Sequence, residues 1–282
     1  MTNISFDDLK NKVCVITGGG GVIGKALALG LGSSGVKTAL LDLNKEMADK
    51  VAAEVKAITG SESIGVETNV LDKDSLEIAK QEVNLKLGRI NMLINGAGGN
   101  SPKATSEAEV MTDDLKNNLE KTFFGLDIAG FEFVFNLNFM GTILPTMVLS
   151  KDMLDNGGVI LNVSSMSAFR PLTKVPAYSA AKASINSITE WLSVHLAPVG
   201  IRVNAIAPGF FLTNQNRFLL TDEKTGELTA RGEKIINNTP MGRFGEVEEL
   251  QGTVNYLMSD LSKFVTGIVI PVDGGFNAFS GV

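Results

Sequence analysis

Residues 16–24 have the sequence ITGGGGVIG and lie between an apolar run at 12–17 and a segment of helical periodicity at 22–34. Glycines let the backbone approach a pyrophosphate, and the N-terminus of a following helix offers free N–H groups and a favourable dipole. Four consecutive glycines lose much backbone entropy on folding, which is hard to justify in a loop without a ligand. The stretch therefore predicts a strand–turn–helix unit that binds a dinucleotide.

The glycine turn can be aligned in two frames. Gly19, Gly21 and Gly24 fit the pattern G-x-G-x-x-G. The alternative pattern, T-G-x-x-x-G-x-G, begins at Thr17 and requires a glycine where the chain has Val22. The turn alone leaves both frames open.

Apolar runs of strand length alternate with helical segments along the chain. Such alternation predicts parallel strands with right-handed crossovers, and unbroken apolar strands are typical of sheets that are covered on both faces. We therefore expect one α/β domain over 1–282, a Rossmann-type three-layer α/β/α sandwich with a seven-stranded parallel sheet. The expected strands are 12–17, 37–42, 63–68, 90–95, 158–165, 201–207 and 267–272, and the expected helices are 22–34, 44–59, 73–87, 130–154, 176–197 and 246–258, with a kink at Pro145.

Two segments interrupt the alternation. Residues 99–129 are long, polar and rich in turn formers, and residues 209–238 form a second irregular stretch. In an open α/β sheet, ligands bind outside the carboxyl ends of the strands. Because both segments follow predicted strands, we expect a loop or helical insertion and a substrate loop that border the site.

Composition excludes several classes of function. The 282 residues have a formal charge of −6 with scattered basic residues, which disfavours nucleic-acid binding. The single cysteine, Cys14, permits no intramolecular disulfide. No signal-peptide pattern and no apolar run of membrane-spanning length is evident, so we expect a cytoplasmic protein without membrane contact. No cluster has metal-ligand spacing, and the single histidine, His195, is interpreted as structural, so we expect no metal.

Asp42 ends the second predicted strand. A carboxylate there accepts hydrogen bonds from ribose hydroxyls and repels a 2′-phosphate, which favours NAD over NADP. Lys45 is close enough in sequence to keep NADP as an alternative. Asn69 and Val70 are expected near the adenine because they follow the third strand.

Tyr178 and Lys182 are four residues apart on a predicted helix and therefore share a face. Ser165 ends the fifth predicted strand, thirteen residues before Tyr178. We expect the two hydroxyl groups to meet above the carboxyl edge of the sheet.

These motifs together resemble the short-chain dehydrogenase/reductase family over most of the chain, from 12 to 275. The matching stretches are the glycine turn, NGAG at 95–98, Asn138 in LNFMG, Ser165, YSAAK at 178–182, IRVNAIAPG at 201–209 and PVDGG at 271–275.

The resemblance implies a role for each matching residue. Tyr178 would be the general acid/base, with its pKa lowered by Lys182 and the oxidised nicotinamide. Lys182 would also hold the nicotinamide ribose, Ser165 would polarise the substrate oxygen, and Asn138 would hold a water that links Lys182 to solvent. Thr213 would bind the carboxamide.

The order of the motifs selects the frame that begins at Thr17, with Val22 as a departure from the family pattern. A β-branched residue does not easily take φ > 0. We therefore expect Gly20 and Gly21 to take up the tight backbone geometry and the N–H of Ile23 to reach the pyrophosphate. The full set expected to bind NAD is Gly18, Gly20, Gly21, Val22, Ile23, Gly24, Asp42, Asn69, Val70, Asn95, Gly96, Ala97, Tyr178, Lys182, Pro208, Gly209 and Thr213.

Longer stretches, among them MSAFRPLTKVPAYS and APGFFLTNQNR, resemble the D-mannonate oxidoreductase (fructuronate reductase) branch of this family. A sugar acid offers one carboxylate and several hydroxyl groups, and a guanidinium can bind a carboxylate bidentately. The residues expected to bind it are Asn100, Ser165, Arg170, Lys174, Asn214 and Arg217.

Other functions stay open. A reductase of another polyol, a gluconate-type ketone or a 3-oxoacyl thioester has the same motifs, and a nucleotide-sensing regulator on this fold is a further alternative. The family resemblance also implies a homo-oligomer, a dimer or tetramer, formed through the helices at 130–154 and 176–197.

Overall fold

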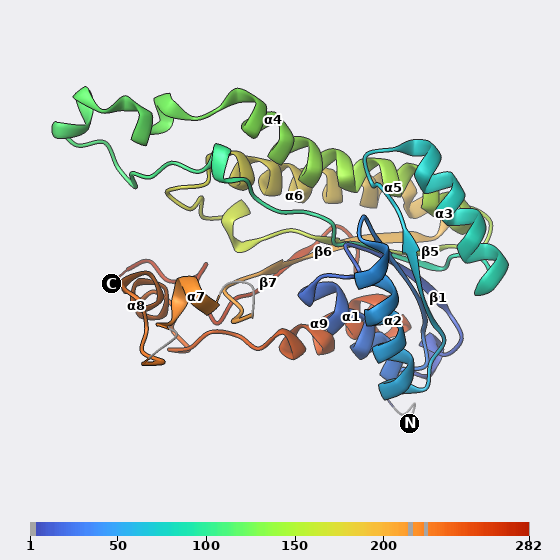
Figure 1. The fold of residues 1–282 in the computed structure, drawn as a ribbon. Helices are drawn as coiled ribbons and strands as arrows, with labels where there is room; N and C mark the ends of the chain where they lie inside the picture. Colours follow the sequence, from blue (N-terminus) through green and yellow to red (C-terminus); the bar gives the residue numbers. More distant parts are fainter. Residues whose placement is uncertain (1–3, 214–216, 223–224, 282) are drawn as a thin grey trace.

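The computed structural model describes residues 4–213, 217–222 and 225–281. Its seven strands form one parallel sheet in the order β3-β2-β1-β4-β5-β6-β7, which confirms the predicted α/β architecture (Figure 1). The strands are β1 (Val13–Thr17), β2 (Lys37–Asp42), β3 (Ser63–Glu67), β4 (Met92–Asn95), β5 (Gly158–Val163), β6 (Ile201–Pro208) and β7 (Val269–Val272).

Helices cover both faces of the sheet, so the molecule has three layers (Figure 1). The helices on one face are α1 (Val22–Ser33), α2 (Lys45–Thr59) and α9 (Leu250–Met258), and those on the other are α3 (Lys73–Lys86), α4 (Ile128–Phe135), α5 (Gly141–Leu149) and α6 (Pro176–Leu196).

The sequence of strand β1 does not alternate between apolar and polar residues, because both of its faces are buried. Cys14 and Ile16 pack in the cluster that contains the buried side of α1, whereas Val13 and Val15 pack in the cluster that contains the buried side of α3. Successive side chains point to opposite faces of a strand, and here both faces are covered by helices. Cys14 is fully buried and packs as a small apolar side chain, and burial raises the pKa of its thiol.

Two helix starts follow the expected capping chemistry. The Asn44 side chain accepts a hydrogen bond from the Met47 N–H, and Asp72 accepts from the N–H groups of the first turn of α3. Helix α2 ends at Gly60, whose φ of 74° is left-handed. These local signals explain why the boundaries predicted for α2 and α3 lie within two residues of the observed ones.

The predicted helix at 130–154 is a composite rod. It contains α4, a π-helical turn (Asn136–Met140), α5, which includes Pro145, and a 3₁₀ turn (Ser150–Met153). The rod as a whole, Ile128–Met153, has 26 residues and a mean hydropathy of 1.4 over its apolar window, which by length and composition suits a membrane span. The expectation that no apolar run reaches this length was therefore wrong. Half of that window is buried in the protein, with α5 against α3 and α4 against α6, as in a core helix of a globular fold.

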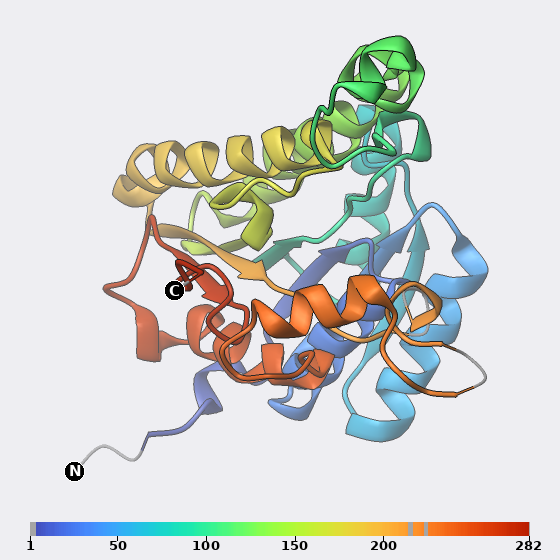
Figure 2. The same ribbon diagram turned by 90° about the vertical axis from the view of Figure 1, so that its left-hand side faces the viewer.

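The 99–129 insertion follows β4 and contains short 3₁₀ turns, as its polar, turn-rich sequence indicates. It projects from the molecule as an arm (green, Figure 1), and the segment after β6 lies across the same edge of the sheet (Figure 2). That segment is not irregular as expected, because it contains α7 (Arg217–Leu220) and α8 (Ala230–Asn237).

A glycine inside α8 explains why sequence periodicity missed this helix. Gly232 lowers helix propensity by about 1 kcal/mol relative to alanine. A Cβ at Gly232 would lie 2.2 Å from the Leu220 carbonyl oxygen, so glycine is required for α8 to pack on α7.

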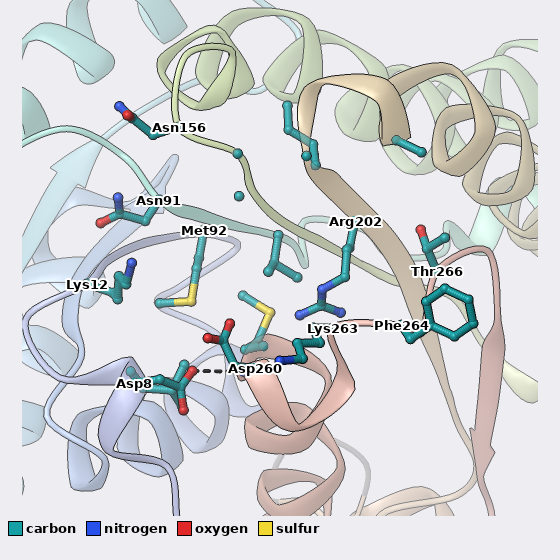
Figure 3. Close-up of a pocket in the computed structure, with 18 residues that line it drawn as sticks. Asp8, Lys12, Asn91, Met92, Asn156, Arg202, Asp260, Lys263, Phe264 and Thr266 are labelled. Atoms are coloured by element: carbon teal, nitrogen blue, oxygen red, sulfur yellow. Dashed lines mark hydrogen bonds between the residues drawn. The ribbon is translucent and has the colours of Figure 1, made fainter.

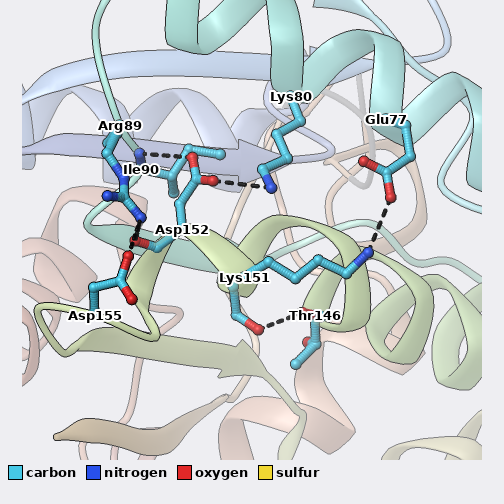
Figure 4. A network of polar contacts seen from close by, with 9 residues as sticks. Glu77, Lys80, Arg89, Ile90, Thr146, Lys151, Asp152 and Asp155 are labelled. Carbon is cyan, nitrogen blue, oxygen red and sulfur yellow. Dashed lines mark hydrogen bonds and ion pairs between the residues drawn. The ribbon is translucent and has the colours of Figure 1, made fainter. Parts of the chain in front are cut away.

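A polar network joins the end of the composite rod to α3 and to the start of β4 (Figure 4). The Asp152 carboxylate lies 2.9 Å from the Lys80 ammonium and accepts a hydrogen bond from the Ile90 N–H at 3.3 Å. Burial raises the pKa of Asp152, but hydrogen bonds from Lys80, Asn84 and Ile90 outweigh it, so the pKa lies below its ordinary value. The charged form of Asp152 therefore stabilises the fold.

We expect Asp152→Asn to lower the free energy of unfolding at pH 7 by about 1–3 kcal/mol, because the substitution removes a charged hydrogen-bond acceptor from a nearly buried site. The pKa is depressed in the folded protein, so this contribution is present above the unfolded value of 3.8 and is lost as pH falls through the folded pKa. Urea denaturation at pH 7 and at pH 3 measures both effects.

The matched control is Asp155→Asn. Asp155 contacts Arg89 at the surface, where its side chain is 72% exposed, so we expect a change below about 1 kcal/mol. Equal losses for the two variants would contradict this interpretation of the network.

Candidate active site

The glycine turn joins β1 to α1 by close packing. Gly18 has a φ of 66°, and a Cβ there would lie 3.0 Å from the backbone of Ala97, at the end of β4. A Cβ at Gly24 would lie 2.5 Å from the Gly18 carbonyl oxygen. The expectation that Gly20 and Gly21 take up the tight geometry was wrong, because neither has a positive φ and Gly18 does. Val22 has a negative φ, as expected for a β-branched residue.

A cleft of about 750 Å³ opens in front of this turn, at the carboxyl ends of β1, β2, β4 and β6. It is bordered by most of the residues expected to hold a dinucleotide: Gly18, Gly21, Val22, Ile23, Gly24, Asp42, Gly96, Gly209 and Thr213, together with Gly98, Asn100, Phe210 and Phe211.

The carboxylate of Asp42 is fixed at the side of this cleft. It accepts hydrogen bonds from the N–H groups of Gly20 and Asn44, each at 3.0 Å. Lys45 pairs with Asp49 one turn along α2. A carboxylate held in this place is suited to ribose hydroxyls.

Several residues expected in the cofactor site lie outside the set that lines the cleft. The Asn95 side chain is buried and donates to Thr146 Oγ1 at 2.9 Å and to Asn162 Oδ1 at 2.8 Å, so it joins β4 to α5 and β5. Asn69 accepts a hydrogen bond from the Leu71 N–H, and Val70 is buried. Gly20, Ala97 and Pro208 do not line the cleft either, although each is next in sequence to a residue that does. Tyr178 and Lys182 are also outside the lining.

Ser165, Tyr178, Lys182 and Asn138 converge at the end of β4 and β5. Lys182 Nζ donates to the Val163 carbonyl oxygen at 2.8 Å and lies 5.7 Å from the centre of the Tyr178 ring. Ser165 lies close enough to the Tyr178 hydroxyl to lower its pKa. The Ser165 Oγ also accepts hydrogen bonds from the N–H and the hydroxyl of Ser167, at 3.2 and 3.0 Å.

Asn138 lies in the π-helical turn, which no pattern in the sequence indicated. Its amide nitrogen donates to the carbonyl oxygens of Gly99 and Val134, at 2.7 and 2.8 Å, and its amide oxygen accepts from the Gly99 N–H. A Cβ at Gly98 would lie 2.6 Å from Asn138 Oδ1 and 3.3 Å from Lys182 Nζ. The π turn thus brings the amide of Asn138 beside Lys182. Single π-helical turns inside α-helices are frequent at functional sites.

The site shifts the pKa values of both catalytic candidates on its helix. Burial raises the pKa of Tyr178, and the nearby Ser165 side chain lowers it in part. Burial lowers the pKa of Lys182 to about 8. Both changes follow from desolvation, which disfavours the charged form of each group.

A second cavity, of about 460 Å³, adjoins the cofactor cleft, since Phe210 lines both. Arg170 and Lys174 line this cavity, as expected for substrate residues. Arg217 lies in α7 and lines neither space, and Asn214 lies outside the described residues. Sequence analysis did not predict that Phe210, Glu109 and Lys234 line this cavity. Phe210 could have been identified, because it directly follows Gly209 in the expected cofactor site.

A cavity of about 660 Å³ lies at the opposite, amino-terminal edge of the sheet (Figure 3). The Arg202 guanidinium beside it donates to the carbonyl oxygens of Leu257, Ser259 and Val265, so its donors hold the backbone together. None of Ser165, Tyr178 and Lys182 lines this space. Its location argues against a role in the reaction, because ligands bind at the other edge.

Within the described part of the chain, no group of three His, Cys, Asp or Glu side chains is placed to hold a metal ion. His195 is exposed and stacks on Trp191, 4.6 Å between ring centres, away from the catalytic end of α6.

Comparison with known proteins agrees with this geometry. The family model for enoyl-(acyl carrier protein) reductase matches residues 20–277. A Haemophilus influenzae crystal structure with bound NAD, whose suggested activity is D-mannonate oxidoreductase, is 52% identical, with 98% of each chain covered and a TM-score of 0.92. The uncharacterized oxidoreductase UxuB of Bacillus subtilis is 48% identical over 98% of both chains. An NAD⁺-bound xylitol dehydrogenase is 30% identical, covers 95% of this chain and 99% of its own, and has a TM-score of 0.81.

We expect Lys182→Met to raise the free energy of unfolding at pH 7 by about 1–3 kcal/mol, because it removes a buried ammonium. The folded pKa of about 8 is below the ordinary 10.5, so the unfolded chain binds this proton more tightly. The cost of the buried charge is therefore complete below pH 8 and fades as pH rises toward 10.5. Denaturant titrations at pH 7 and pH 10.5 measure it, and a gain that is equal at both pH values would contradict the assignment.

Proposed function

The chain belongs to the short-chain dehydrogenase/reductase family, and on that premise we propose that it is an NAD-dependent oxidoreductase that interconverts a keto and a hydroxy sugar acid, D-fructuronate and D-mannonate. The observation that carries the proposal is the proximity of Lys182 to Gly98 in the wall of the cofactor cleft, because Tyr178 and Ser165 lie next to Lys182 and the cleft adjoins a cavity lined by Arg170 and Lys174. Neither Ser165 nor Tyr178 lines either space. The chemistry needs a hydroxyl pair at the reacting carbon and a cation for the carboxylate.

The residues of the cleft fit a dinucleotide. The turn packs tightly on its own backbone at Gly18 and Gly24, which brings its main chain to the cleft, and the N-terminus of α1 faces the same space. The fixed carboxylate of Asp42 favours NAD, because it repels a 2′-phosphate. When bound, the nicotinamide supplies or accepts the hydride.

Tyr178 is suited to act as the acid in the reducing direction. Its raised pKa keeps the phenol protonated at neutral pH. Ser165 polarises the substrate oxygen, and Tyr178 donates a proton to that oxygen as it gains charge.

In the oxidising direction Tyr178 must accept a proton. The ammonium of Lys182, 5.7 Å from the ring centre, and the positive charge of an oxidised nicotinamide favour the phenolate. Lys182 would also hold the ribose hydroxyls, and Asn138 would position a water beside Lys182 for proton exchange with solvent. Oxidation is therefore favoured at higher pH than reduction.

A second candidate function is the reduction of a 3-oxoacyl thioester. The apolar side chains of Leu172, Val175 and Ile235 line the same cavity as the two cations, which suits an acyl chain.

Steady-state kinetics on a panel of ketones test the proposal. We expect the kcat/KM for D-fructuronate with NADH to exceed that for neutral ketoses and a 3-oxoacyl thioester by tenfold or more, ~1.4 kcal/mol, since these lack the carboxylate that meets the cations of the cavity. A gluconate-type ketone also carries a carboxylate, so a higher kcat/KM for it than for D-fructuronate would identify the other sugar acid as the substrate. Tyr178→Phe should lower kcat by about 10²–10⁴-fold, because it removes the proton donor. Turnover of the thioester alone would refute the substrate, and unchanged turnover in Tyr178→Phe would refute the mechanism.

We also propose that the protein works as a cytoplasmic homo-oligomer, a dimer or tetramer, assembled through α4, α5 and α6. Large apolar side chains are exposed there: Phe133, Met147, Trp191 and Val194. Burial of such side chains drives association. Light scattering at known concentration should give a multiple of 29.9 kDa, and Val194→Asp should shift the mass toward the monomer.

The control is Ile58→Asp on α2, at the opposite face, where the side chain is 68% exposed. A monomeric wild-type protein, or equal dissociation by both variants, would refute this assembly.

A further inference from the structure

The cavity beside the cofactor cleft is built from segments far apart in the sequence, and besides Phe210 and Phe276 three of them supply its wall. Its wall contains the loop at 170–175, which joins the Ser165 turn to the start of α6, one side of α8, and Glu109 from the 99–129 insertion. A volume of about 460 Å³ is large enough for a small organic acid, since ligand pockets begin at roughly 300 Å³.

The charges that line this cavity are unbalanced. Four cations border it, Arg170, Lys174, Arg231 and Lys234, with a single carboxylate, Glu109. Among the described residues, Lys234 alone of the four cations has an ion-pair partner, and that partner is Glu109. Like charges around one space repel one another, so the arrangement favours the binding of a further anion.

Glu109 pairs with Lys234 and lies within the electrostatic range of Lys174 and Arg231. Its ion pair with Lys234 lowers the pKa of the carboxyl group, and the charges of Lys174 and Arg231 lower it further. An acidic side chain whose carboxylate faces three cations from two other segments is placed as a bound carboxylate ligand would be.

The tether of Glu109 is short and is attached to the cavity wall. The Ser106 N–H donates to the Lys174 carbonyl oxygen at 2.9 Å, and Ser106 Oγ donates to the Ala108 carbonyl oxygen at 2.7 Å. The backbone on the C-terminal side of Ser106 is thus held at the cavity, while the Glu109 side chain itself is exposed and free to leave.

We propose that Arg170, Lys174, Arg231 and Lys234 form the carboxylate subsite for the substrate, and that Glu109 fills it in the free protein as an internal carboxylate that the acid substrate displaces. This inference rests on the proposed function, because it identifies where the carboxylate of a sugar acid binds. It adds α8 and the insertion to the site, neither of which the catalytic motifs include.

Displacement explains how Glu109 would set selectivity. When Glu109 moves away, Lys234 loses its carboxylate partner. The carboxylate of an entering acid replaces that partner, whereas a neutral polyol cannot. Glu109 therefore competes with every acid and weakens its binding, while it leaves the binding of a neutral analogue unchanged. Because the side chains are exposed, the competition is screened by salt.

Calorimetric titration of the enzyme–NADH complex tests the inference, since no hydride can pass to an alcohol in that complex. The probes are D-mannonate, malate as a smaller acid, and D-mannitol as the neutral counterpart of mannonate. We expect Glu109→Gln to tighten binding of both acids about threefold to tenfold and Lys174→Met to weaken it by a similar factor, with no change for mannitol. These differences in affinity should shrink in about 0.5 M salt, because the Debye length there is well below the value of about 10 Å at 0.1 M.

Glu107→Gln is the matched control, because Glu107 is an exposed carboxylate on the same loop that does not line the cavity. It should leave all three affinities unchanged. Weaker binding of acid and neutral probes alike in Glu109→Gln would overturn the inference and would identify the Glu109–Lys234 pair as a structural tie.

The two proposals fail separately. If malate binds more tightly to Glu109→Gln and more weakly to Lys174→Met, but no sugar acid is reduced, the carboxylate subsite stands and the proposed substrate is wrong. If D-fructuronate is reduced efficiently but Glu109→Gln leaves the affinity for mannonate and malate unchanged, the proposed function stands and the internal carboxylate is wrong.

Discussion

A buried ammonium at the end of β5 is the constraint on which the catalytic arrangement depends. Lys182 is 5% exposed, its Nζ donates to the Val163 carbonyl oxygen, and within the described part of the chain it forms no ion pair with a carboxylate. Burial of an unpaired charge opposes folding, and the strands and helices around it must supply the compensating stability. The fold thereby keeps a positive charge 5.7 Å from the centre of the Tyr178 ring. Among the described residues, no carboxylate pairs with this charge. In the proposed mechanism, the same charge that lowers stability stabilises the phenolate of Tyr178, a trade-off common at active sites.

The parallel sheet makes this arrangement possible because it brings distant residues to one edge. Ser165 follows β5, Gly98 follows β4, and the glycine turn follows β1, so three strand ends that are neighbours in the sheet meet the N-terminal part of α6. These relations could be predicted from the sequence, since apolar runs define the strands and a spacing of four places Tyr178 and Lys182 on one helical face. The capping side chains Asn44 and Asp72 fixed helix starts in the same local way.

What could not be predicted depends on contacts between segments. The positive φ lies at Gly18 and not at Gly20 or Gly21, because the turn must pass close to the backbone of Ala97, and four identical residues in a row carry no information about which one does so. The π-helical turn at Asn138 leaves no mark in an apolar periodicity that α4 and α5 share. Helix α8 contains a glycine that argues against a helix until its contact with Leu220 is known. Arg217 was the arginine of this segment expected to bind the substrate, but the packing of α8 places Arg231 on the cavity instead.

The two spaces at this edge differ in how firmly the fold holds their walls. The cofactor cleft is made of turns directly attached to strands, whose positions the core fixes within the sheet. The adjoining cavity is made of the 170–175 loop, α8 and the insertion, which are joined to one another by a few hydrogen bonds and one exposed ion pair. Such contacts are worth little individually, so these segments can shift with a ligand at small cost while the hydroxyl pair stays fixed. If the proposed function holds, recognition of the acid and transfer of the hydride can be tuned independently, with Phe210 as the shared wall of the two spaces.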